Sequence, residues 1–332
     1  MSNKKKIFTG ICVSLLFFGF FIFLKNISKK ISGNPNTKVT VILDWSPNTN
    51  HTGIYVAKEK GYFAKEHLDV QILQQADDAT EAVATGKIDF AISSQESVTE
   101  ARVKDIPIVS VAAIIQHNTS AFASLASTHI ITVRDFEGKR YGGWGSPIEE
   151  AVLTAVMQDA RAQYSNVKNI TIGTTDFFNS IGRDADFEWI FYGWDGIEAK
   201  RRGIAINTIM LKDLNPILDY YTPVIITNEQ HVKEQKELVT KFMNAVSEGY
   251  TFSIHNPDEA GRILLRDAPE LNADLVHQSQ AWLSPRYQAD TDHWGEQKAQ
   301  VWQRYAQWMF DKKLIEKMIT VNDAFTNEFL PK

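Results

Sequence analysis

Side chains able to hold a small molecule follow two apolar stretches of the sequence, at the points where those stretches end. Asp44 and Trp45 close the first stretch, and Tyr192, Trp194 and Glu198 lie on the turn after the second. Aromatic side chains stack on flat rings, and a carboxylate accepts hydrogen bonds from an amine. The combination predicts a site for a flat, amine-bearing heterocycle. The structural alternative is that the carboxylates cap or solvate helices and the aromatic side chains pack in the core.

Glu96 is a further candidate for this site, because it falls in the first turn of an expected helix after a third apolar stretch. A helix N-terminus also favours a carboxylate there without any ligand. Sequence motifs for catalysis are absent: there is no P-loop, no G-x-G-x-x-G after a strand, no nucleophile elbow and no H-E-x-x-H. The eight histidines do not have the spacing of metal ligands. We therefore expect a binding site without catalytic residues, metal or cofactor.

Alternating strands and helices must position these residues. Short apolar strands and helices of about ten residues predict an α/β fold with a doubly wound parallel sheet. Ligands of such sheets bind outside the carboxyl ends of the strands, and two similar edges predict a cleft between two lobes. The expected strands are 39–43, 70–73, 88–92, 108–115, 170–173, 187–191, 206–211 and 222–227.

The expected domain organisation has four parts. Residues 1–37 form an N-terminal signal anchor and tether, 38–117 the first part of lobe 1, 118–221 lobe 2, and 222–332 the return to lobe 1 with C-terminal helices. Crossings near Asn118 and Thr222 would serve as hinges. The aromatic stripe of Trp302, Tyr305 and Trp308 is expected to be core.

The composition excludes several classes of partner. A net charge of -5, without a Lys/Arg patch beyond the N-terminus, gives no case for nucleic acid. Cys12 is the only cysteine, so a disulfide or a cysteine-rich metal site within one chain is impossible. Lipidation of Cys12 is disfavoured, because it precedes most of the apolar run instead of following it.

The N-terminus predicts a membrane segment. Lysines 4–6 precede an uncharged run over 7–24, which is just long enough to span a bilayer as a helix. No convincing cleavage site follows before Pro35. We expect an uncleaved anchor that holds the body at the extracytoplasmic face of the cell membrane. A secreted protein is the alternative if the segment is cleaved.

The segment from Leu43 to Gly53, Leu-Asp-Trp-Ser-Pro-Asn-Thr-Asn-His-Thr-Gly, resembles the solute-binding proteins for thiamine pyrimidine precursors. Segments 142–150, 192–199 and 302–308 resemble the same family. The resemblance implies a two-lobed type II periplasmic-binding-protein fold, with a ligand cleft between the lobes for formylaminopyrimidine or hydroxymethylpyrimidine. It also implies an ABC transporter permease as partner.

Carried over by residue, the resemblance puts Asp44, Trp45, Tyr192 and Glu198 in the cleft. Trp194 and Glu96 are added from their positions in the sequence. Asn48 and His51 belong to the same motif, with a role in ligand contact or in the shape of the loop.

Two alternatives stay open. Thiamine pyrimidine synthases of the same superfamily need a lysine, a nearby histidine and a cysteine-rich loop, whereas this sequence has Ser93 and Ser97 at the first two places and no cysteine over 195–199. We therefore expect a protein that is not an enzyme. The other alternative is a different flat or anionic solute, such as a sulfonate or nitrate, which Asp44 and Glu198 would repel.

Overall fold

The computed structural model describes residues 36–74, 79–173 and 175–331. The chain divides into two units, Met1–Thr37 and Lys38–Lys332, and only residues 36 and 37 of the first are described. The expected anchor over 7–24 and Cys12 therefore lie outside the described residues. Within the described ranges, no helix is long and apolar enough to cross a membrane.

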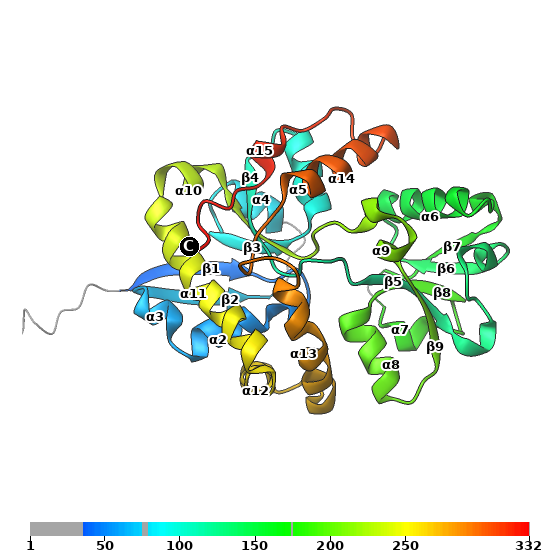
Figure 1. Cartoon of the computed structure of the whole chain (residues 1–332), viewed down its shortest axis with the longest axis horizontal. Coiled ribbons are helices and arrows are strands. Elements are labelled where there is room, and N and C mark those ends of the chain that lie inside the picture. The colour runs from blue at the N-terminus through cyan, green and yellow to red at the C-terminus, as the bar shows by residue number, and fades with distance from the viewer. Residues whose placement is uncertain (1–35, 75–78, 174, 332) are drawn as a thin grey trace, which may run out of the picture. The chain divides into compact units, whose positions relative to one another are not determined.

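The first lobe is built on a five-stranded sheet in the order β2-β1-β3-β10-β4 (Figure 1). Both β4 and β10 are buried at every position, as expected for strands covered on both faces. The strands are β1 (Thr37–Ile42), β2 (Leu68–Leu73), β3 (Phe90–Ser93), β4 (Ile108–Ala113) and β10 (Val224–Asn228). The helices are η1 (Thr49–His51), α2 (Thr52–Glu59), α3 (Tyr62–Lys65), α4 (Ala79–Ala84), α5 (Gln95–Val103), α10 (Glu229–Glu234), α11 (Lys236–His255), α12 (Pro257–Asp267) and α13 (Ala273–Gln288).

The second lobe has its own five-stranded sheet, in the order β7-β6-β8-β5-β9. Its strands are β5 (Ser120–Leu125), β6 (Arg140–Gly143), β7 (Lys168–Thr171), β8 (Phe187–Phe191) and β9 (Ile206–Met210). Its helices are η2 (Ala126–Thr128), η3 (Val133–Phe136), α6 (Pro147–Asp159), η4 (Tyr164–Asn166), α7 (Phe177–Ser180), η5 (Tyr192–Gly196), α8 (Ile197–Arg201), α9 (Leu211–Leu214) and η6 (Pro216–Leu218). The two-lobed α/β architecture predicted from the sequence is confirmed.

Each sheet is mixed, and in this respect the expected parallel sheet is wrong. In the first lobe β1 and β3 are parallel, but β10 runs antiparallel to β3 and β4. In the second lobe β6 is parallel to β7 and β8, but β5 is antiparallel to β8 and β9. The two antiparallel strands, β10 and β5, each directly follow a crossing between the lobes. A chain that arrives from the other lobe enters the sheet at the edge where the parallel strands end, so it must run in the opposite direction.

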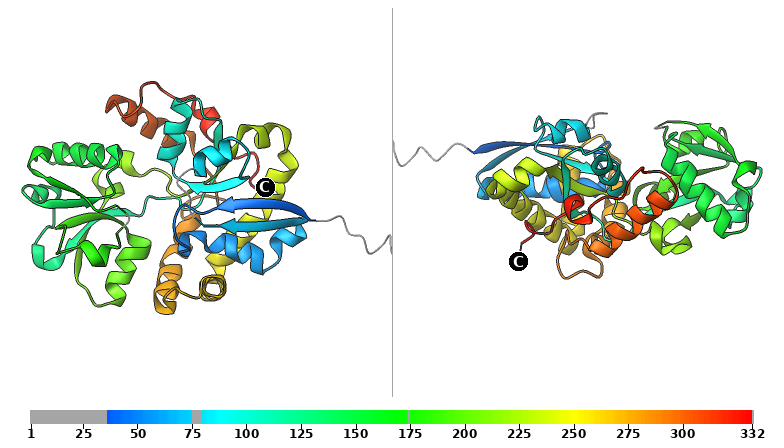
Figure 2. Two further views of the ribbon diagram at one scale, coloured as in Figure 1. Left: turned by 180° about the vertical axis from the view of Figure 1, so that it is seen from behind. Right: turned by 90° about the horizontal axis from the view of Figure 1, so that it is seen from above.

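The C-terminal helices α14 (Ala299–Asp311) and α15 (Val321–Ala324) complete the fold. Trp302 of α14 packs with residues of the first lobe, such as Val224, whereas Tyr305 and Trp308 pack with the core of the second, which includes Val152. All three aromatic side chains are buried, so their expected role in core packing is confirmed. The orange-red helix α14 thereby joins the cores of both lobes (Figure 2).

Helices α2 and α11 cross at a pair of glycines. A Cβ at Gly249 would lie 2.0 Å from the carbonyl oxygen of Gly53, and one at Gly53 would lie 2.3 Å from the ring of Tyr250. The contact therefore has no room for a side chain on either helix. The close approach holds α2, which carries the end of the loop after β1, against the core.

We expect Gly249→Ala to destabilise the protein by about 1–3 kcal/mol, since overpacked contacts force the backbones apart. Gly261→Ala is the matched control, because a Cβ in that helix meets nothing closer than 3.4 Å. Chemical denaturation measures both free energies of unfolding. Equal stability of Gly249→Ala and the parent protein would contradict the close packing.

Candidate functional site

A cavity of about 390 Å³ lies where the parallel strands of the two sheets end, which is the expected place for a ligand in α/β sheets. Its wall combines the loop after β1, the ends of the second lobe's strands and the crossing before β10. The lining residues are Asp44, Trp45, Asn48, Asn50, Gly142, Gly143, Trp144, Ile172, Gly173, Thr175, Asp176, Phe177, Glu188, Trp189, Ile190, Phe191, Asp195, Thr222 and Pro223.

The loop after β1 contributes one oriented carboxylate and one aromatic ring. His51 is fully buried, and its Nδ1 accepts the backbone N–H of Asn48 at 3.3 Å. Its Nε2 must therefore carry the proton, which it donates to Asp44 Oδ1 at 2.7 Å. This leaves the second oxygen of Asp44 for a ligand. The role of His51 is to orient Asp44.

Buried tyrosines hold the same loop from behind. The hydroxyl of Tyr250 donates to the carbonyl of Asn50 at 2.6 Å, and that of Tyr287 donates to the carbonyl of Thr49 at 2.5 Å. The loop is thus fixed to α11 and α13. Trp45 remains 38% exposed beside the cavity, although hydrogen bonds fix the loop that carries it. Its ring is therefore available to a ligand.

The second lobe contributes two further tryptophans. Trp144 and Trp189 meet edge to face, with ring centroids 5.5 Å apart. Trp144 is 42% exposed, and together with Trp45 and Phe191 it places three exposed large apolar side chains around one cavity. Exposed apolar surface concentrated in this way marks a binding site.

A buried carboxylate shapes the loop that carries Trp144. Glu149 accepts hydrogen bonds from the backbone N–H groups of Trp144, Gly145 and Ser146, at 2.8 to 3.1 Å, and from the hydroxyl of Tyr141 at 2.7 Å. Ser146 and Glu149 form a capping box at the start of α6. The N–H groups of this loop are therefore already occupied by a carboxylate within the protein.

Three carboxyl groups of the second lobe line the cavity. Burial, together with the charge of the neighbouring Asp176 carboxylate, raises the pKa of Glu188 to about 8 and that of Asp195 to about 7. Asp195 accepts the backbone N–H of Phe191 at 3.1 Å, whereas Glu188 Oε1 has no hydrogen-bond partner among the described residues. Asp44 is the fourth acid. The described lining contains no lysine, arginine or histidine, so this cavity favours ligands that donate hydrogen bonds.

The remaining candidates from the sequence lie outside the cavity lining. Tyr192 packs against Trp282 of α13, with ring centroids 5.2 Å apart, and Trp194 packs against the core of the first lobe. Glu96 is half-buried in the first turn of α5, where burial and the carboxylates of Glu100 and Glu149 raise its pKa to about 8. The structure thus brings Asp44 and Trp45 together at the cavity. Tyr192, Trp194 and Glu96 do not belong to its lining.

Glu198 has partners of its own. Glu198 is 5% exposed. Its carboxylate pairs with Arg201 at 2.6 Å and also with Arg202, the next residue along the chain. Although burial acts in the opposite direction, the two guanidinium groups hold the pKa of Glu198 below its ordinary value. Both carboxylate oxygens of Glu198, which a ligand amine would need as acceptors, are therefore already hydrogen-bonded to Arg201 and Arg202.

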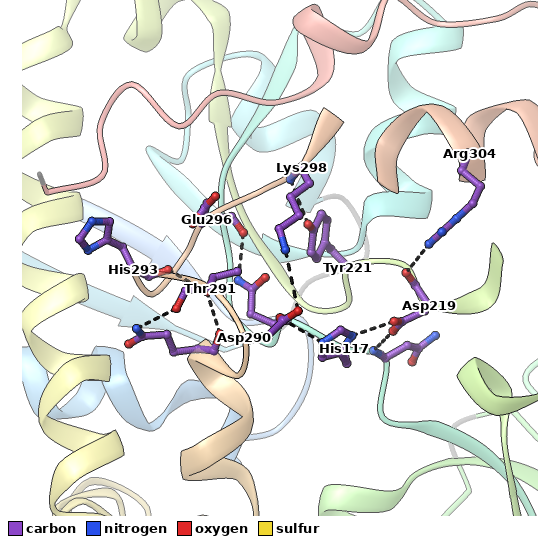
Figure 3. Close-up of polar contacts among 12 residues, drawn as sticks. His117, Asp219, Tyr221, Asp290, Thr291, His293, Glu296, Lys298 and Arg304 are labelled. Carbon is purple, nitrogen blue, oxygen red and sulfur yellow. Dashed lines mark hydrogen bonds and ion pairs between the residues drawn. The ribbon is translucent and has the colours of Figure 1, made fainter. Parts of the chain in front are cut away.

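A polar network ties the two crossings together (Figure 3). His117, before β5, lies with Nδ1 2.7 Å from Asp219 and Nε2 3.2 Å from Asp290. The hydrogen bond to Asp219 and the charges of both carboxylates raise the pKa of His117. Asp219 also accepts the backbone N–H of Asn118 at 2.9 Å, so the outgoing and returning chains are joined where they pass between the sheets.

Comparison with known proteins places the chain in a family. Residues 48–260 match the family model described as NMT1/THI5 like. The formylaminopyrimidine-binding protein of Halalkalibacterium halodurans is 31% identical over 301 residues, covering 87% of this chain and 89% of that protein. The chain belongs to the NMT1/THI5-like family.

This NMT1/THI5-like protein is also similar to an enzyme and to binding proteins of known structure. A 4-amino-5-hydroxymethyl-2-methylpyrimidine phosphate synthase of Legionella pneumophila is 24% identical over 307 residues, covering 89% of this chain and 93% of the enzyme. The periplasmic aliphatic sulphonate binding protein SsuA of Escherichia coli superposes with a TM-score of 0.68 at 14% identity, covering 86% of this chain and 96% of that one. The structural likeness shows the two-lobed type II binding-protein fold, as predicted.

The acids and aromatic side chains of the lining that were not singled out from the sequence are Trp144, Asp176, Phe177, Glu188, Trp189, Phe191 and Asp195. Glu188 had a usable signal, because a glutamate inside an otherwise apolar strand is rarely buried without a reason. Asp195 lies beside Trp194, on the turn that was expected to reach the cleft, and it is the residue of this turn that lines the cavity. Which side chain of a turn faces inward depends on its backbone path, which residue types alone do not reveal.

We expect Glu198→Gln to lower the free energy of unfolding by about 1–3 kcal/mol, because it removes hydrogen bonds to two charged groups. It should leave ligand affinity nearly unchanged. The stability difference should shrink as the pH falls below about 4.5, since a lowered pKa stabilises the fold only while the carboxylate is ionised. Denaturant titrations over a pH series measure this.

Glu237→Gln is the control, because Glu237 makes a similar helical pair with Lys241 but is 83% exposed, and such pairs contribute little. A large loss of ligand affinity in Glu198→Gln with unchanged stability would return Glu198 to the binding site.

Proposed function

We propose that this protein is the solute-binding component of an ABC importer and that its cavity binds an aminopyrimidine precursor of thiamine, of the formylaminopyrimidine or hydroxymethylpyrimidine class. The observation that carries the proposal is the cavity lining, with four carboxyl groups, exposed tryptophans and no basic side chain among the described residues. The formylaminopyrimidine-binding relative supports the same ligand class.

An aminopyrimidine matches this lining group by group. Its ring is flat and offers faces to Trp45 from the first lobe and to Trp144 and Trp189 from the second. Its exocyclic amine and the polar hydrogen of its 5-substituent must lose water on entry, and Asp195 and Asp44 offer oxygens that replace those hydrogen bonds. The ligand thereby joins the two lobes, because each supplies both a ring and an acceptor.

Anionic solutes match it poorly. A sulfonate would meet the carboxyls of Asp44, Asp195 and Glu188 without a cation among the described lining residues. Backbone N–H groups at a helix N-terminus are the usual substitute for a cation. At α6 those groups already bond Glu149, so we propose that the cavity excludes sulfonate and nitrate.

We propose that the protein binds its ligand without converting it. The synthase relative makes this a choice within one family, and it depends on particular residues. At the places where the synthases carry the lysine and histidine of their reaction, this chain has Ser93 and Ser97. Ser97 is engaged with the helix cap, its backbone N–H donating to Ser94 Oγ at 3.1 Å.

Delivery would use closure of the lobes about the crossings that His117 and Asp219 join. A ligand held by both lobes stabilises the closed arrangement by its differential contacts there. The closed form would then dock on a permease at the extracytoplasmic face of the membrane.

At a pH above 7, where Asp195 is mostly ionised, we expect Asp195→Asn to weaken binding of hydroxymethylpyrimidine by about ten- to a hundredfold, because a charge-assisted hydrogen bond contributes ~1.5–3 kcal/mol. Isothermal titration calorimetry measures the affinity. Asp213→Asn is the control, since Asp213 pairs with Lys212 at an exposed position outside the lining. If parent and Asp195→Asn bound the pyrimidine equally, or if methanesulfonate bound the parent more tightly, the proposed ligand class would be wrong.

The proposed location is tested separately. We expect the mature chain to retain residues 7–24 and to sediment with membranes, because no cleavage site follows the apolar run. N-terminal sequencing that began near Gly33 would identify a secreted protein instead.

A further inference from the structure

One oxygen of a buried acid in the cavity has no hydrogen-bond partner among the described residues. Glu188 is 3% exposed, and its Oε1 has no hydrogen-bond partner among the described residues. A buried polar atom without a partner costs stability. Proteins tolerate such a cost mainly at functional sites, and Glu188 belongs to the lining of the ligand cavity.

The surroundings of Glu188 favour a neutral carboxylic acid. Asp195 and Asp176 line the same cavity, and Asp184 and Tyr141 are the other titratable groups near it. Burial is the largest influence and, with these carboxylates, raises the pKa of Glu188 to about 8 although the Ser180 hydroxyl acts in the opposite direction. A neutral acid differs from a carboxylate in one decisive way, because it can donate a hydrogen bond as well as accept one.

We propose that Glu188 is a specificity-determining residue that pairs, as a neutral acid, with the edge of the bound pyrimidine where a ring nitrogen adjoins the exocyclic amine. Its O–H donates to the ring nitrogen, and its carbonyl oxygen accepts one amine N–H. The second amine N–H is left for Asp195. This assignment rests on the proposed function and deepens it, because it explains why a cavity that already contains Asp195 also buries an acid oxygen that has no partner among the described residues.

The proposal predicts an order of affinities that a charged carboxylate would not give. Glutamine also carries one donor and one acceptor, so Glu188→Gln should bind hydroxymethylpyrimidine within about threefold of the parent. Methionine has a similar length but neither group, so Glu188→Met should lose about ten- to a hundredfold. A pyrimidine that lacks the exocyclic amine should bind weakly to the parent, and Glu188→Met should weaken it little further.

The pH dependence of binding reports the ionisation of Glu188. Asp195 titrates in both the parent and Glu188→Gln, so its direct effect on the ligand is common to both, and in the parent its charge also helps to raise the pKa of Glu188. Parent affinity relative to Glu188→Gln should fall as the pH rises through about 8, where Glu188 ionises and loses its donor. Without ligand, Glu188→Gln should become the more stable of the two as the pH rises from 4.5 toward 8, because a raised pKa stabilises the fold only at low pH.

Calorimetry of the parent, Glu188→Gln and Glu188→Met with both pyrimidines, over a pH series, tests the proposal. Melting temperatures of the unliganded variants at or above that of the parent show that each is folded. Parent-like affinity of Glu188→Met would overturn the contact, and equal losses in both variants would overturn the neutral acid in favour of a charge. If the parent bound neither pyrimidine, the proposed function would fail first and this assignment with it.

Discussion

Carboxyl groups buried without a cation are the constraint on which the site depends. In the second lobe, burial raises the pKa values of Glu188 and Asp195, so it favours the neutral form of each. The described lining residues include no basic side chain. Such a surface is unfavourable when empty, because desolvated acceptors have few partners. A ligand rich in N–H donors relieves this, and an anion makes it worse. The selectivity of the cleft follows from this unpaired acidity more than from its shape.

The fold brings this acidic surface to the edge of each lobe at which its parallel strands end. The parallel strands end at the cavity, and the antiparallel strands β5 and β10 start there, since the chain enters each sheet from the crossing. A short polar chain connects the facing loops: Thr49 Oγ1 lies 2.5 Å from Ser279 Oγ, which also bonds the carbonyl of Gly193. The loop with Asp44 and the turn with Asp195 are therefore positioned through one helix, α13.

Much of this architecture could be predicted from the sequence, because it follows from local patterns. Alternating strands and helices indicated two α/β lobes, and the capping box at Ser146 and the loop from Asp44 to His51 were visible as motifs. The antiparallel strands were not predictable in this way, since the direction of a strand depends on where the chain enters the sheet. The strand β5 was missed because its residues, Ser-Ala-Phe-Ala-Ser-Leu, are weakly apolar.

The site was predictable only where its residues continue a motif. Asp44 and Trp45 follow directly from the end of β1. Glu198 has Arg201 and Arg202 three and four residues later, a spacing at which helical side chains pair, and this pairing occupies its carboxylate.

Mass spectrometry of the small molecules released from the purified body of the protein (residues 38–332) tests the central claim most directly. An aminopyrimidine in molar proportion to the protein is the predicted result. A sulfonate, or another solute without an N–H donor, would contradict the account.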